Sequence, residues 1–134
     1  DIDVDAEIVL NSPNVTATYI DLILRYTDAD NFWSLNFHDV TFILWEKNAG
    51  SFTNRAQVAI TSSDNTDYKM TGIAEGQTIT GFLDGANKIS YAGAALNETV
   101  TTHGVRTQVA NDLLDNFAIY PRGTGAEYSD LDTY

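Results

Sequence analysis

Acidic residues alternate with apolar ones at the start of the chain, in a pattern that could support acid–base chemistry. Asp1, Asp3, Asp5 and Glu7 stand two positions apart, so on an extended strand their carboxylates would share one face at intervals of about 6.6 Å. Two carboxylates at such a spacing can flank a glycosidic bond as acid and base. The alternative is a solvated strand face whose charges protect a sheet edge. We favour this alternative, because the residues open the chain instead of lying in the middle of a sheet.

Asp28, Asp30 and Asn31 gather oxygen ligands in one short segment. A hard cation such as calcium binds several oxygens arranged in this way, so the segment is a candidate calcium site. It lacks the longer ligand-bearing loop of specific calcium sites, and turns favour the same residue types without any metal. The plain turn is therefore the preferred interpretation, with calcium as the alternative.

Trp45, Phe32 and Tyr91, together with Lys47, are candidates for a carbohydrate-binding platform. A flat apolar ring beside polar groups suits the mixed surface of a pyranose. Large aromatic side chains are also common in protein cores, and Trp33 is expected there. Trp45 is the strongest candidate for an exposed ring, but the core is the preferred interpretation for it as well.

The two histidines are not accompanied by a pattern of nucleophile and base. His38 and His103 are far apart in sequence, and no serine or aspartate stands near them in a nucleophile-elbow context. We therefore predict that the protein is not an enzyme.

The charge balance argues against two classes of partner. Seven Lys and Arg against nineteen Asp and Glu give a formal net charge of −12, which repels nucleic-acid phosphates and anionic membrane surfaces. No apolar run approaches the ~18 to 20 residues of a membrane helix, so membrane insertion is not expected. The chain has no cysteine, which excludes disulfides and thiolate metal sites.

The candidate residues would be positioned by β-strands, because a period of two dominates the chain and no segment sustains a period of 3.6. The expected strands cover residues 2–10, 15–27, 32–37, 40–47, 52–60, 68–74, 78–84, 88–91, 105–110 and 117–120. Gly, Asn and Asp punctuate them at the spacing of a sandwich. The pattern predicts an all-β fold, an antiparallel two-sheet β-sandwich of jelly-roll type.

Four places in the chain, in this order, carry a resemblance to a known family. They are Arg-Tyr-Thr-Asp-Ala-Asp-Asn-Phe at 25–32, Leu-Trp-Glu-Lys-Asn-Ala-Gly at 44–50, Gly-Phe-Leu-Asp-Gly at 81–85, and His-Gly-Val at 103–105 with Asp-Asn-Phe at 115–117. The chain resembles the concanavalin-like, laminin-G-like β-sandwich domains of secreted bacterial proteins and phage virion proteins. Tyr-Pro-Arg-Gly at 120–123 is similar to the endings of such phage domains. The resemblance implies a jelly roll that is extracellular or part of a virion.

We expect one domain over residues 1–121, followed by a polar, glycine-rich tail or linker over 122–134. Domains of the family that the chain resembles usually carry one or two further strands before the position of Asp1. The resemblance therefore implies that N-terminal strands are missing, which would leave residues 2–10 at an unpaired sheet edge. An upstream segment or a neighbouring protomer is expected to cover that edge.

Two non-catalytic roles are consistent with these features. In one the domain binds carbohydrate through an exposed aromatic side chain. In the other it is a structural or adhesion module of a virion or cell-surface assembly, which contacts other protein subunits and can be oligomeric. The alternative to both is a glycan-processing jelly-roll enzyme of the glycoside hydrolase type.

Overall fold

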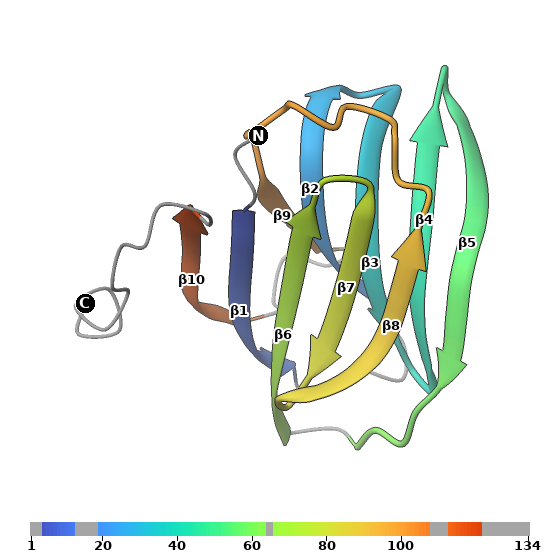
Figure 1. Ribbon diagram of the computed structural model, residues 1–134. Coiled ribbons are helices and arrows are strands. Elements are labelled where there is room, and N and C mark those ends of the chain that lie inside the picture. The colour runs from blue at the N-terminus through green and yellow to red at the C-terminus, as the bar shows by residue number, and fades with distance from the viewer. Residues whose placement is uncertain (1–3, 13–18, 64–65, 108–112, 122–134) are drawn as a thin grey trace.

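The computed structural model describes residues 4–12, 19–63, 66–107 and 113–121, and within these ranges every regular element is a β-strand (Figure 1). The described strands are β1 (Val4–Ser12), β2 (Tyr19–Asp28), β3 (Asn31–His38), β4 (Thr41–Asn48), β5 (Ser51–Ala59), β6 (Thr66–Glu75), β7 (Thr78–Leu83), β8 (Ala86–Ala92), β9 (Gly104–Thr107) and β10 (Leu113–Pro121). The described ranges contain no apolar helix long enough to cross a membrane. The predicted all-β fold is confirmed.

The described strands form two antiparallel sheets of five strands each, stacked face to face (Figure 1). One has the order β10-β1-β6-β7-β8 and is called the β1 sheet here; the other has the order β5-β4-β3-β2-β9 and is called the β3 sheet. Strands β2 to β5 follow one another as neighbours, and so do β6 to β8, because short turns join them. β9 and β10 come from late in the chain and pair with β2 and β1.

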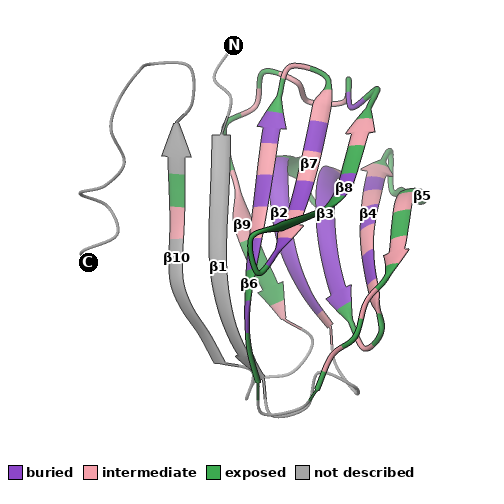
Figure 2. Cartoon of the chain, turned by 60° about the horizontal axis from the view of Figure 1, so that its bottom comes forward, coloured by how far each residue is buried: buried purple, intermediate pink, exposed green. Residues whose placement is uncertain are grey.

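The core lies between the two sheets, and its described residues alternate along β2, β3, β4, β6 and β7. Trp33, Leu35 and Phe37 of β3 are buried there and belong to one cluster with Met70 and Ile79 of the β1 sheet. Figure 2 shows the alternation as purple and pink bands along β4, β6 and β7. The indole Nε1 of Trp33 donates a hydrogen bond to the carbonyl of Leu96 at 2.9 Å. The expectation that Trp33 belongs to the core is confirmed.

Two facing glycines let the sheets approach closely. Gly72 and Gly81 are paired across β6 and β7. A Cβ on Gly81 would lie 2.8 Å from Leu35 Cδ2 and 3.0 Å from Phe42 Cε1, and one on Gly72 would lie 2.9 Å from methyl groups of Leu22 and Leu35. Leu35 therefore occupies space that any larger residue at these positions would take.

Tight turns join the strands where the sequence predicts them. Ala49 and Gly50 have φ of 49° and 81°, and Asp84 and Gly85 have φ of 50° and 77°. Positive φ at both central residues matches the right-handed twist of the strands that they connect. After β3 the turn lies one residue later than expected: Asp39 has a φ of 50° and Val40 is exposed in the turn, so β4 begins at Thr41.

The prediction that the first strand would present an unpaired edge is wrong. β1 pairs with β10 on one side and with β6 on the other, so it is an inner strand. Sequence periodicity does not show that the last strand returns to the first, because a period of two is the same on edge and inner strands. Residues 122–134, expected as a tail, and residues 13–18 and 108–112, parts of which were expected in strands, lie outside the described ranges.

Candidate functional site

The outer face of the β3 sheet carries polar residues that are buried, which is unusual for a face turned away from the core. Residues 20–25 of β2 and 32–37 of β3 are buried without interruption, so both faces of these two strands are covered. Strand register places Asp21 beside Asn36, and Ile23 beside Ser34. Because buried polar groups need partners, these side chains must be held by others on the same face.

Asp21 is the centre of this polar cluster and is 0% exposed. Its Oδ1 accepts hydrogen bonds from Ser34 Oγ at 2.8 Å and from Asn36 Nδ2 at 2.7 Å. Its Oδ2 accepts a hydrogen bond from Arg106 Nε at 2.6 Å and also contacts Arg106 Nη2. A buried carboxylate is stable only with such a set of charged and neutral donors.

Arg106 covers Asp21 and faces solvent. It lies on β9, opposite Asp21 in the strand register, and its side chain is 43% exposed. The guanidinium carbon lies 5.4 Å from the ring centroid of Tyr19 and 6.0 Å from that of Phe32, distances at which a cation is attracted to an aromatic face. The buried carboxylate and the two rings hold the guanidinium in one orientation.

An aromatic row continues across the same face. The rings of Tyr26 and Phe32 are stacked at 6.0 Å, Phe32 meets Phe52 edge to face at 6.0 Å, and Phe52 meets Trp45 edge to face at 6.1 Å. Lys47 Nζ lies 5.0 Å from the Phe52 centroid and 5.6 Å from that of Phe32. Phe52 is 48% exposed, whereas Phe32 is only 4% exposed. The row therefore offers solvent mainly Phe52, Tyr26 and part of Trp45.

The first of two hollows on this face lies beside Trp45 and has a volume of about 370 Å³. We call it the Trp45 hollow. Its apolar lining is Ile43, Trp45, Phe52 and Tyr19, and its polar lining is Asn36, His38, Asp21 and Arg106. It combines aromatic surface with amide, imidazole and guanidinium groups.

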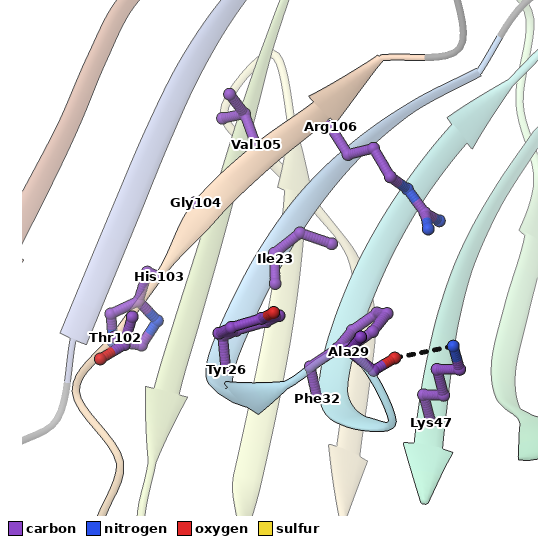
Figure 3. Close-up of a pocket in the computed structure, with 10 residues that line it drawn as sticks. All are labelled: Ile23, Tyr26, Ala29, Phe32, Lys47, Thr102, His103, Gly104, Val105 and Arg106. Carbon is purple, nitrogen blue, oxygen red and sulfur yellow. Dashed lines mark hydrogen bonds between the residues drawn. The ribbon is translucent and has the colours of Figure 1, made fainter. Parts of the chain in front are cut away.

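The second hollow, of about 490 Å³, lies at the end of β2 and the start of β3, against the segment that leads into β9 (Figure 3). We call it the Lys47 hollow. Tyr26 and Phe32 form its aromatic side, and Lys47 and Arg106 supply its charges. Thr102, His103 and Gly104 complete the lining. Lys47 Nζ donates a hydrogen bond to the carbonyl of Ala29 at 2.7 Å. Arg106 lines both hollows.

His103 joins this segment to β2 at Arg25, within the stretch from Leu24 to Asp28 where the register with β3 shifts. Its Nδ1 accepts a hydrogen bond from the backbone N–H of Arg25 at 3.2 Å, so in the neutral ring Nε2 carries the proton. Burial, followed by the positive charge of Arg25, lowers the pKa of His103 to about 4. Nε2 is buried and has no hydrogen-bond partner among the described residues. His103 is therefore neutral at pH 7 and acts as a structural contact between β2 and β9.

The structure brings together three of the four residues predicted for a carbohydrate platform. Trp45, Lys47 and Phe32 share the outer face of the β3 sheet, although Phe32 is covered by its neighbours. Tyr91 does not join them: it lies on β8 in the other sheet, and its ring packs against Trp33 at a centroid distance of 5.9 Å. Its place in the platform was wrong, because sequence alone does not tell which sheet a strand joins.

Phe52 and Arg106, which also line the Trp45 hollow, were not predicted from the sequence. Phe52 lies opposite Lys47 across the turn at Ala49 and Gly50, and this pairing could have been derived from the hairpin spacing. No signal in the sequence connects Arg106 with Asp21, which lies 85 positions earlier.

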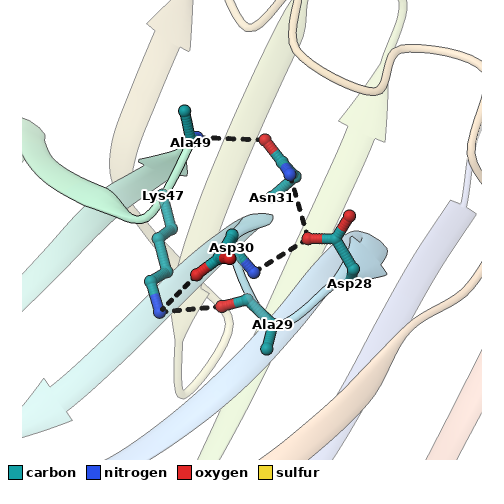
Figure 4. A network of polar contacts seen from close by, with 6 residues as sticks. All are labelled: Asp28, Ala29, Asp30, Asn31, Lys47 and Ala49. Atoms are coloured by element: carbon teal, nitrogen blue, oxygen red, sulfur yellow. Dashed lines mark hydrogen bonds and ion pairs between the residues drawn. The ribbon is translucent and has the colours of Figure 1, made fainter.

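The predicted calcium ligands meet in the turn between β2 and β3 (Figure 4). Asp28 Oδ1 accepts hydrogen bonds from the backbone N–H of Asp30 at 2.8 Å and from Asn31 Nδ2 at 2.9 Å, and the bond from Asn31 is the main cause that lowers the pKa of Asp28. Asn31 Oδ1 accepts from the N–H of Ala49 at 3.1 Å, and Asp30 Oδ1 lies 3.9 Å from Lys47 Nζ. The turn itself therefore explains why Asp and Asn occur at these positions, because their side chains bond to nearby backbone and side-chain groups. A calcium ion here stays a prediction.

The buried carboxylates of the described chain do not converge. Asp21 lies on the outer face of the β3 sheet, whereas Glu46 lies in the inner row of β4 and pairs with Arg55 Nη2 at 3.3 Å. In the ranges that the structure describes, no group of three or more His, Asp or Glu could hold a metal. Asp1 and Asp3 of the acidic ladder lie outside those ranges, and the side chains of Asp5 and Glu7 are not described.

The two stacked antiparallel sheets form a jelly-roll β-sandwich of the concanavalin-like kind. Sheep galectin-11, solved with glycerol, superposes with a TM-score of 0.71 at 9% identity, over 90% of this chain and 91% of the galectin. The carbohydrate-binding module CBM66 from Bacillus subtilis gives a TM-score of 0.70 at 17% identity, over 89% of this chain and 74% of the module. CG-16, a homodimeric agglutinin from chicken liver, gives 0.67 at 7% identity, over 88% and 90%.

At these identities the likeness concerns the fold alone. No family model matches the chain, and no curated protein matches it by sequence.

Proposed function

We propose that the protein is a non-catalytic carbohydrate-binding β-sandwich module and that the Trp45 hollow is its binding site. The observation that carries the proposal is the half-buried Trp45 beside the exposed Phe52, in a hollow whose other side is polar. The names of the structural neighbours, which include galectins, an agglutinin and a carbohydrate-binding module, support the same class of ligand.

The chemistry of the hollow fits a sugar ring. The apolar C–H face of a pyranose packs on aromatic rings, and its hydroxyls need donors and acceptors at the edges. Asn36 Oδ1 and Arg106 Nη1 make no hydrogen bond within the described residues. The lining therefore offers one acceptor and one donor to the hydroxyls of a sugar. Asp21 fixes both side chains in advance, which lowers the entropy lost on binding.

Hydrolysis of a glycan is the weaker alternative. A glycosidase needs two carboxylates on either side of the same bond. Asp21 already accepts hydrogen bonds from three side chains, and Glu46 lies on the opposite face of the sheet. The proposed binding of a sugar in the Trp45 hollow does not require a calcium ion at Asp28 and Asp30.

The proposal also places the module outside the cell or on a virion, where it would attach a surface assembly to a glycan. This part is supported by the resemblance of the sequence to domains of secreted and virion proteins.

A glycan array probed with the wild-type protein and two alanine variants tests the binding function. Trp45→Ala is expected to weaken binding of every glycan hit at least about tenfold, since an aromatic anchor of an interface commonly contributes ~2 kcal/mol or more. The matched control is Phe82→Ala, which removes a half-buried ring from the outer face of β7 in the β1 sheet and should leave binding unchanged. Absence of any glycan hit, or equal loss in both variants, would refute the proposal.

A further inference from the structure

The Lys47 hollow opens beside the Trp45 hollow, and Arg106 lines both of them. The rings of Phe32 and Phe52, with Lys47 over both, lie between the two. A ligand longer than one sugar ring that lies on Trp45 would therefore extend toward Lys47.

The charges in the Lys47 hollow are positive. Its described lining includes Lys47 and Arg106 but no Asp or Glu, in a chain with a net charge of −12. The partner of Arg106, Asp21, is 1% exposed at its side chain and its oxygens already accept hydrogen bonds, so the solvent side presents the guanidinium. The partner of Lys47, Asp30, is 3.9 Å away and 67% exposed, whereas the side chain of Lys47 is 19% exposed; at this distance, and with the carboxylate in solvent, the pair is weak. An anionic group in the hollow would gain two cationic neighbours without displacing a buried ion pair.

The floor of the hollow leaves room for a ligand. Gly104 lies on β9 opposite Ile23, and a Cβ built on it would meet nothing within 4 Å. Thr102 adds a hydroxyl to the same lining, and Tyr26, a residue that is 38% exposed, adds an aromatic ring. The hollow thus offers space, an aromatic wall and two cations together.

We propose that the Lys47 hollow binds the carboxylate or sulfate group of an acidic glycan, one sugar of which lies on Trp45. This inference rests on the proposed carbohydrate binding and adds the charge of the ligand. Lys47 Nζ uses one of its three donors on Ala29, so it can also donate to an anionic oxygen. The positively charged guanidinium of Arg106 faces the same hollow.

The first test uses matched pairs of glycans on the array: uronic-acid oligosaccharides beside their methyl esters, and sulfated oligosaccharides beside their desulfated forms. The acidic member of at least one kind of pair is expected to bind about tenfold or more tightly, as for a hydrogen bond to a charged group, and the kind of pair identifies carboxylate or sulfate as the source. Equal or tighter binding of the neutral members would overturn the acidic subsite and leave the proposed function standing. If no glycan binds, both proposals fail.

The second test uses two variants that alter the hollow in different ways. Lys47→Met removes the charge and keeps an apolar stem against Phe32 and Phe52, whereas Gly104→Val fills the open space. Both are expected to weaken binding of the best acidic glycan on the array more than binding of its neutral partner, so that the preference for the acid is lost. Lys88→Met, an exposed charge on β8 of the other sheet, is the control and should preserve the preference. A preference for acid that survives Lys47→Met and Gly104→Val would refute the subsite.

Discussion

Asp21 shows how a single carboxylate can organise a surface. It is fully buried on the outer face of a sheet, and every polar contact that it makes comes from the face itself: Ser34 and Asn36 on β3 and Arg106 on β9. The guanidinium of Arg106, which is exposed to solvent, is therefore positioned by a carboxylate that is buried. Removal of either member of the pair therefore has a different consequence from removal of both.

Arg106→Met is expected to lower the free energy of unfolding by about 1–3 kcal/mol, because it removes the charged donor of a buried carboxylate that keeps only its bonds from Ser34 and Asn36. The double variant Asp21→Asn/Arg106→Met should recover a large part of this loss, since a neutral amide can keep one hydrogen bond to Ser34. Urea denaturation of the two variants and the wild type measures both values. A loss below about 1 kcal/mol for Arg106→Met, as for an exposed ion pair, would contradict this account.

At the scale of strands, local patterns were enough to predict which residues are extended. The expected strand 32–37 is Asn31–His38 in the structure, and 78–84 is Thr78–Leu83, since alternation and turn residues act over a few positions. Trp45 and Lys47 could be placed on one face for the same reason. The pairing of β9 with β2 could not be predicted, because no local signal tells which distant strand supplies a sheet neighbour. The site residue Arg106 was missed for that reason.

Gly81→Val tests the close approach of the two sheets. The new side chain would overlap Leu35 and Phe42, and overpacking of this kind costs about 1–3 kcal/mol. Gly104→Val is the matched control, because the same substitution in another strand meets open space and is expected to cost less than about 0.5 kcal/mol. Thermal unfolding of the two variants compares them directly, and equal destabilisation would show that backbone effects, not packing, decide the result.

For the molecule as a whole, His103 contributes to acid sensitivity. In the unfolded chain its pKa is near 6.5, whereas burial and Arg25 lower the pKa to about 4 in the folded protein. Between these values the unfolded state binds more protons, so protonation favours unfolding and stability falls as the pH decreases from about 6.5 to about 4. Above a pH of about 6.5 the ring is neutral in both states, so His103 no longer makes the stability depend on pH.

His103→Asn should flatten the dependence of the melting temperature on pH in that interval, because the amide oxygen can replace Nδ1 as the acceptor for the N–H of Arg25 but takes up no proton. Differential scanning calorimetry at a series of pH values measures the slope. His38→Asn, at the exposed end of β3, is the control. If it flattens the slope as much as His103→Asn does, burial of His103 is not the cause.

Because Arg106 lies on β9, it can join the outer face of the β3 sheet only late in folding. Strands β2 to β5 are sequential neighbours, so their hairpins close short loops and can form early. Asp21 meets Arg106 only after a segment 85 positions later has docked beside β2. During synthesis from the N-terminus the aromatic row can therefore assemble before the charged group that completes both hollows, so the proposed carbohydrate site would be completed late in folding. A nascent chain that ends before β9 would carry the aromatic row without the guanidinium that lines both hollows.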